Sequence, residues 1–126
     1  MIRKVLYPAA PLLLVDDETQ FLASAAFILK GAGIDNVVTC SDSRRVMPLL
    51  REQAFSGVLL DLSLPKMGGK ELLPDIVANF PHTPVIIVTA SNDAETAVQC
   101  LKTGAVDYLV KPLCSDSFLA AVRKIL

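Results

Sequence analysis

The sequence predicts an α/β fold of three layers, in which helices cover both faces of a parallel five-stranded sheet. Short apolar runs without polar alternation recur five times, as is typical of strands buried on both faces of such a sheet. Segments with helical spacing of apolar residues lie between the runs. Strand–helix alternation repeated in this way indicates a layered α/β domain. The five runs are Leu12–Asp16, Asn36–Cys40, Gly57–Asp61, Pro84–Thr89 and Val106–Val110.

The helical segments differ in how clearly their ends are marked. The first is expected to stop at Gly31, and the fourth to begin with the capping-box pair Asn92 and Glu95 and to end at Lys102 and Gly104. The first and last helices have apolar faces made of Phe21, Leu22, Ala25, Ile28 and Leu29, and of Phe118, Leu119, Val122, Ile125 and Leu126.

Prolines interrupt the two remaining helices. One of residues 41–43 is expected to cap the second helix, which contains Pro48, and the third begins near Gly69 and contains Pro74. The last helix is expected to begin at residue 115 or 116. A proline inside a helix removes one backbone hydrogen bond, so we expect irregularity at both prolines.

Length and connection rules narrow the topology. A chain of 126 residues is one domain, here with residues 1–10 as a short lead-in. Right-handed crossovers and five strands favour the flavodoxin-like (βα)5 order 2-1-3-4-5. In this order ligands bind at the carboxyl ends of the strands, beside the switch point between the first and third strands.

Composition excludes several classes of protein. The chain carries 12 basic and 13 acidic residues with no basic run longer than two, so we expect no direct binding of nucleic acid. The apolar stretch 5–15 is interrupted by prolines and is too short for a membrane span, which favours a cytoplasmic domain with no membrane association. Cys40, Cys100 and Cys114 are widely spaced and His82 is the single histidine, so a zinc site is not expected.

Polar residues gather where the predicted strands end. Asp16 and Asp17 end the first run, Asp61 the third and Thr89 the fourth, and Lys111 follows the fifth. Three close carboxylates repel one another unless a divalent cation or an ammonium group offsets their charge. A nucleophilic oxygen, a metal such as Mg²⁺ and a fixed cation are what phosphoryl transfer requires.

A plainer interpretation is that these acids only cap helices. Aspartate is a favoured N-cap residue, and for Asp17 the two interpretations are about equally good. For Asp61 capping is a poor explanation, because residues 62–65 do not resemble the start of a helix. The convergence of all five positions favours a functional site.

These motifs resemble the receiver domain of two-component response regulators over nearly the whole chain. The matching stretches are 12–18 (LLLVDDE), 57–69 (GVLLDLSLPKMGG), 84–90 (PVIIVTA) and 104–112 (GAVDYLVKP). The part from residue 89 to residue 112 particularly resembles receivers that precede sigma-54-dependent transcription activators. The resemblance implies a phosphorylation-dependent switch and not a conventional enzyme.

The resemblance also implies roles for single residues. Asp61 would accept a phosphoryl group from a histidine kinase, and Asp16 and Asp17 would hold Mg²⁺ with Asp61 and the backbone carbonyl of Ser63. Thr89 would contact the phosphoryl group, as would the lysine at position 111.

Further implications concern signal output. Tyr108 would be the aromatic switch, and the bond between Lys111 and Pro112 would be cis. The partner surface would lie on the fourth helix, fifth strand and fifth helix. An output domain, expected to be transcriptional, would follow this chain, and phosphorylation would favour a homodimer.

The chain departs from the family pattern in the loop after Asp61, and three other classes of protein fit its residues less well. Met67-Gly68-Gly69 stands where Met-Asp-Gly is common, which removes an acid from the loop.

A haloacid-dehalogenase-like phosphatase needs a second acid where Ser63 stands. A flavin-binding protein needs a glycine-rich phosphate loop where this chain has three acids. A pseudo-receiver that takes no phosphate is disfavoured because all five key residues are present.

Overall fold

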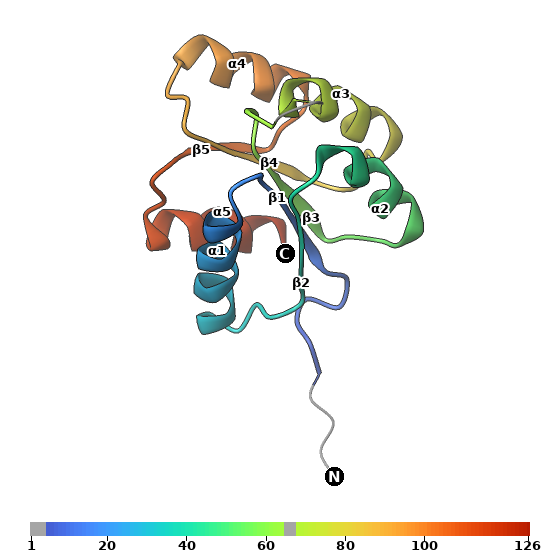
Figure 1. Cartoon of the computed structure of the whole chain (residues 1–126), viewed down its shortest axis with the longest axis vertical. Coiled ribbons are helices and arrows are strands. Elements are labelled where there is room, and N and C mark those ends of the chain that lie inside the picture. The colour runs from blue at the N-terminus through green and yellow to red at the C-terminus, as the bar shows by residue number, and fades with distance from the viewer. Residues whose placement is uncertain (1–4, 65–67) are drawn as a thin grey trace.

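The computed structural model describes residues 5–64 and 68–126, and it confirms the predicted sheet (Figure 1). All strand pairs are parallel and the strand order is β2-β1-β3-β4-β5. Each predicted run is one residue longer than the strand that forms. The strands are β1 (Leu12–Val15), β2 (Val37–Cys40), β3 (Gly57–Leu60), β4 (Val85–Thr89) and β5 (Asp107–Val110).

The helices form the two outer layers. In Figure 1 helices α1 and α5 lie on one side of the sheet, and α2, α3 and α4 lie on the other. A short 3-10 turn, η1, leads directly into α2. The elements are α1 (Thr19–Gly31), η1 (Ser43–Arg45), α2 (Val46–Glu52), α3 (Gly69–Asn79), α4 (Ala94–Thr103) and α5 (Ser115–Ile125). In the described part of the chain, every helix falls short of the length and apolarity needed to cross a bilayer.

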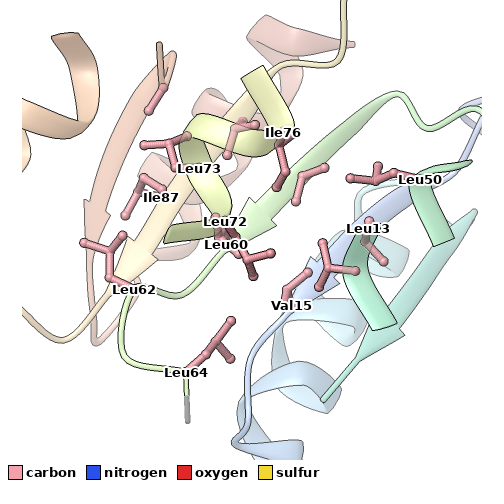
Figure 2. Packing of buried hydrophobic residues seen from close by; sticks show 14 of the residues in the cluster. Leu13, Val15, Leu50, Leu60, Leu62, Leu64, Leu72, Leu73, Ile76 and Ile87 are labelled. Atoms are coloured by element: carbon pink, nitrogen blue, oxygen red, sulfur yellow. The ribbon is translucent and has the colours of Figure 1, made fainter. Parts of the chain in front are cut away.

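Alternating strand residues divide the core into two clusters, one on each face of the sheet. Leu13 and Leu60 face α2 and α3, and Leu12 and Leu59 face α1 and α5. Figure 2 shows the first cluster, in which strand side chains meet those of α3 such as Leu72. Because both faces of the strands are buried, the runs needed no polar alternation.

The predicted stop of α1 at Gly31 is confirmed, and the predicted cap of α4 is wrong by one residue. Gly31 is the last residue of α1, and the positive φ of 85° occurs at Gly33. The N–H of Ile34 donates to the carbonyl of Leu29 at 2.9 Å, so a Schellman motif closes the helix directly after Gly31. At α4 the N-cap is Asp93 and not the expected Asn92. The predicted end of α4 at Gly104 is confirmed.

The two prolines are accommodated differently. Pro48 is the third residue of α2, where its missing N–H would have no helical partner, and this helix is only 7 residues long. Pro74 lies inside α3 and is exposed, so the helix continues with one backbone bond missing. The 3-10 turn before α2 begins at the cap residue Asp42, one of the three expected.

The described part of the lead-in is tied to the loop before β2. The backbone carbonyl of Tyr7 accepts hydrogen bonds from the N–H groups of Asp35 and Asn36, at 2.9 and 3.0 Å. The Asn36 side chain donates to the carbonyls of Pro8 and Ala9, at 2.8 and 3.1 Å. The lead-in therefore covers the end of the sheet opposite to the predicted site.

Candidate functional site

The register of the central strands places two acids side by side. Val15 and Leu60 are paired as the last residues of β1 and β3, and Asp16 and Asp61 follow them directly. The N–H of Asp61 donates to the carbonyl of Val15 at 3.1 Å, so the pairing continues into the site. Asp16 is 1% exposed and Asp61 is 4% exposed. Both carboxyl groups are therefore buried at the carboxyl end of the sheet.

Asp17 completes a group of three carboxylates. Each of Asp16, Asp17 and Asp61 offers an oxygen, and these oxygens lie within 4.8 Å of one another. Asp17 is exposed and does not cap α1, whose N-cap residue is Glu18. The Glu18 N–H instead donates to Oδ1 of Asp16 at 2.9 Å. The capping interpretation of Asp17 therefore has no support in the geometry.

Lys111 partly offsets the charge of this group. Its Nζ lies 2.5 Å from Oδ2 of Asp16 and 4.0 Å from Oδ2 of Asp61. The Lys111 side chain is 12% exposed, so these attractions act with little solvent screening. The same Nζ lies 4.1 Å from the centre of the Phe21 ring of α1.

The pKa of Asp61 reflects its surroundings. Burial raises the pKa of Asp61 above its ordinary value, and the nearby charge of Asp16 raises it further. The Ser63 N–H, the Lys111 ammonium and a hydrogen bond from the Thr89 hydroxyl act in the opposite direction. Without a bound cation this site therefore holds its negative charge at a cost.

Two leucines anchor the loop that follows Asp61. Leu62 and Leu64 are buried in the cluster under α3, as Figure 2 shows, while Ser63 between them is exposed. The Ser63 N–H donates to Oδ1 of Asp61 at 3.2 Å. The loop backbone is therefore fixed beside the carboxylate.

Glycines complete this loop. The Gly69 N–H donates to the carbonyl of Leu62 at 3.1 Å, and a Cβ at Gly69 would lie 2.7 Å from the Leu62 Cα. Gly68, the N-cap of α3, has an ordinary φ of −69° and room for a side chain. Its lack of a side chain therefore removes a cap and relieves no strain. The neighbouring Met67 lies outside the described residues.

The fourth and fifth strands supply the remaining predicted side chains. Thr89 is fully buried at the end of β4, and the following Ala90 is exposed. The half-buried Tyr108 of β5 donates its hydroxyl to the carbonyl of Ser91 at 2.9 Å. The peptide bond between Lys111 and Pro112 is cis, as the resemblance implied.

The structure thus gathers the predicted residues at one edge of the sheet. Three acids, a lysine and a threonine converge there, with Tyr108 on the neighbouring strand. Sequence reasoning did not assign Phe21, Gly69 or the two loop leucines to the site. Their signals, an aromatic in the first turn of a helix and a small residue after a loop, are common in any α/β domain.

A buried acidic site beside a lysine, at the switch point of a parallel sheet, defines a class of α/β proteins that bind charged ligands there. The sequence matches the family model described as response regulator receiver domain over residues 12–123. The chain therefore belongs to the response regulator receiver family, whose domains serve in signalling.

Relatives agree with this assignment. Transcriptional regulatory protein ZraR of Escherichia coli (strain K12) is 41% identical over 115 residues, which are 91% of this chain and 26% of that protein. NtrX from Brucella abortus, crystallised in complex with ATP, superposes with a TM-score of 0.85 at 30% identity, covering 94% of this chain and 27% of that one. The chain spans about a quarter of the length of the curated relatives it matches.

A further solved structure is similar at the level of the domain. It is a response regulator protein from Burkholderia pseudomallei with a phosphorylated aspartic acid, a calcium ion and citrate. The TM-score is 0.80 at 28% identity, over 89% of this chain and 65% of that one. Membership of this family removes the phosphatase and flavin-binding alternatives.

Proposed function

We propose that this chain is a phosphorylation-dependent switch in which Asp61 accepts a phosphoryl group from the phosphohistidine of a histidine kinase. One observation carries the proposal: the buried Asp61 carboxylate shares a group of three acids with Asp16 and Asp17 and faces the Lys111 ammonium. A buried nucleophilic oxygen beside a fixed cation suits an acceptor of phosphoryl groups.

The same acids fit a divalent cation. Carboxylate and carbonyl oxygens are the ligands that Mg²⁺ prefers, and Asp16, Asp17 and Asp61 offer three oxygens within 4.8 Å of one another. We assign these residues, with the backbone carbonyl of Ser63, as the Mg²⁺ ligands. When bound, Mg²⁺ supplies positive charge that polarises phosphoryl oxygens. The calcium ion in the Burkholderia relative supports a site of this kind.

Each of the chain's own groups has a defined part in the transfer. An Asp61 carboxylate oxygen attacks the phosphorus atom, the P–N bond of the phosphohistidine breaks, and its electron pair returns to the histidine nitrogen. Lys111 offsets the negative charge of the transferred group. The Thr89 hydroxyl donates a hydrogen bond to one phosphoryl oxygen, which requires it to leave Asp61.

Labelling with a small phosphodonor tests this function. In the presence of Mg²⁺ we expect intact-mass spectrometry to show one added phosphate on the parent chain and none on Asp61→Asn. Asp75→Asn, which changes an exposed acid on α3, is the matched control and should label normally. Equal labelling of Asp61→Asn and the parent chain would show that Asp61 is not the phosphoryl acceptor. A parent chain that takes no label would be a pseudo-receiver.

The surface that changes on phosphorylation is proposed to lie over α4, β5 and α5. Val98 and Leu101 of α4 are 49% and 46% exposed. Val106, which precedes β5, and Val110, which ends it, are 53% and 40% exposed. Exposed large apolar side chains on these two neighbouring elements support a surface for partner contact there. Tyr108 lies on the same strand, so a change in its hydroxyl partner would alter this surface.

Thr89 is proposed to couple the site to that surface. Movement of its hydroxyl toward the phosphoryl group leaves space beside the Tyr108 ring, which turns inward and leaves the Ser91 carbonyl. Thr89→Ala should still be phosphorylated at Asp61 but should lose partner binding or dimerisation. Sedimentation with and without a beryllofluoride phosphate mimic measures this, and a full response of Thr89→Ala would disprove the coupling.

The output is proposed to be transcriptional and to lie in a domain C-terminal to this chain. The names of its relatives, such as Transcriptional regulatory protein ZraR, support this proposal. We further propose a sigma-54-dependent activator as the full-length protein, a homodimer on phosphorylation, and DNA binding by another domain. Sequencing the gene beyond the codon for Leu126 tests this, because an ATPase domain is expected there.

A further inference from the structure

We propose that Phe21 is a positioning residue, whose ring holds the Lys111 ammonium against the carboxylate group. The inference deepens the proposed function and rests on it for the role of Lys111. Phe21 lies beside the acids, lysine and threonine of the site and has no assigned part in the transfer. It touches none of the reacting groups directly and acts through Lys111.

The contact has the geometry of a cation–π interaction. Lys111 Nζ lies 4.1 Å from the ring centre, well within the range of about 6 Å over which an aromatic face attracts a cation. With its side chain 12% exposed, Lys111 has lost most of its water. Such desolvation strengthens the attraction between a ring and an ammonium group.

The lysine needs such support because its own side chain is flexible. Lys111 follows β5 and reaches Asp16 and Asp61, which follow β1 and β3, through a four-carbon stem. Two carboxylates attract the ammonium, but at different distances, 2.5 and 4.0 Å. The Phe21 ring of α1 supplies a third contact, which restricts the ammonium group to one position.

Phe21 is itself held in place. It lies in the first turn of α1, near the acids that precede this helix, and it packs against the core cluster between the sheet and α1 and α5. One side of the Phe21 ring therefore packs against the core, and its face contacts the Lys111 ammonium. It also limits the water that reaches Lys111.

Two substitutions separate an aromatic role from simple filling of space. Phe21→Leu keeps an apolar side chain but removes the aromatic face, whereas Phe21→Tyr keeps the face. Phe27→Leu is the matched control, because Phe27 is a second phenylalanine of α1 and is 79% exposed. All three variants retain the helix, since these residues differ little in helix propensity.

The first measurement is independent of phosphorylation. Protons above an aromatic ring are shielded, so the Lys111 ε-methylene NMR signals should lie upfield in the parent chain. We expect this shift to be lost in Phe21→Leu and kept in Phe21→Tyr and Phe27→Leu. A shift that is absent from the parent chain, or unchanged in Phe21→Leu, would overturn the positioning role.

The second measurement is the rate of phosphorylation by the small phosphodonor with Mg²⁺. We expect Phe21→Leu to be slower by about three- to tenfold, as loss of one cation–π contact predicts. Phe21→Tyr and Phe27→Leu should match the parent. A rate for Phe21→Leu equal to that of the parent also overturns the proposal. If the parent takes no phosphate, the proposed function fails, while the NMR comparison still decides the position of Lys111.

Discussion

The two ends of the parallel sheet are closed by different kinds of contact. At the amino end neutral backbone groups pair: the N–H of Leu12 donates to Asn36 at 3.0 Å, and that of Val106 donates to Val85 at 2.8 Å. The lead-in and the Asn36 side chain add further neutral hydrogen bonds there. Each of these contacts satisfies a polar group without placing a charge in the interior.

At the carboxyl end the backbone pairing continues, and buried polar side chains are added to it. Asp16, Asp61 and Thr89 are buried there, and Lys111 supplies the opposite charge. Neighbouring carboxylates lower the stability of the fold unless a cation is bound. The acids at this end therefore reduce stability while supplying the groups of the site. The comparison predicts that removal of neutral hydrogen bonds at the amino end weakens the fold alone, while removal of a charge at the carboxyl end weakens the function.

The largest effect is expected from Gly69→Ala, where the carboxyl end depends on close backbone packing. The new Cβ would lie 2.7 Å from the Leu62 Cα, so the loop that carries Ser63 must move. We expect a loss of roughly 2–4 kcal/mol in the free energy of unfolding, measured by urea denaturation, and much slower phosphorylation of Asp61.

Gly57→Ala is the matched control at the amino end. There the nearest atom to a new Cβ is Ile125 Cδ1 at 2.5 Å, the far end of a flexible side chain near the C-terminus. This variant should lose about 1 kcal/mol or less, with normal phosphorylation. Equal losses in the two glycine variants would mean that the loop after Asp61 is more adaptable than its packing indicates.

A smaller loss is expected from Asn36→Ala at the amino end. The substitution removes two hydrogen bonds to the lead-in, to the carbonyls of Pro8 and Ala9. We expect the free energy of unfolding to fall by about 1 kcal/mol, because each such bond contributes modestly. Phosphorylation should be unchanged, and a slowed reaction would show that the two ends of the sheet are coupled.

The opposite sign is expected from Asp17→Ala at the carboxyl end. Asp17 is exposed, caps no helix and lies among like charges, so without Mg²⁺ the melting temperature should stay the same or rise. Mg²⁺ binding, measured by calorimetry, should weaken. A clear drop in the melting temperature of the metal-free protein would restore the capping interpretation, for which the cost is about 1 kcal/mol.

The smallest effect concerns the reactivity of two thiols, those of Cys40 at the end of β2 and of Cys114 before α5. Burial raises the pKa of Cys40, whereas N–H groups of Ser117 and Asp116 lower the pKa of the exposed Cys114. The Cys114 thiolate therefore forms at lower pH, and its alkylation by iodoacetamide should begin at a pH where Cys40 does not react. Peptide mass spectrometry after a pH series measures this, and equal labelling would contradict it.

The sheet and the five polar positions at its carboxyl edge could be predicted from the amino-acid sequence. Continuous apolar runs mark doubly buried strands locally, and a residue such as Asp61 that follows a strand is read directly from the chain. Helix starts were harder to predict, because adjacent residues compete for one cap. Asp93 is the cap of α4 where Asn92 was expected, whereas α1 ends at Gly31 as expected.

The contacts that support those five positions became visible only in the folded chain. Phe21 meets Lys111 because α1 and the end of β5 converge beside the sheet, although the two residues are far apart in sequence. Leu62, Leu64 and Gly69 fix the loop after Asp61 through packing under α3. Such contacts depend on how the elements are placed relative to one another. Apolar periodicity predicts which face of an element is buried, but not which side chains of other elements that face contacts.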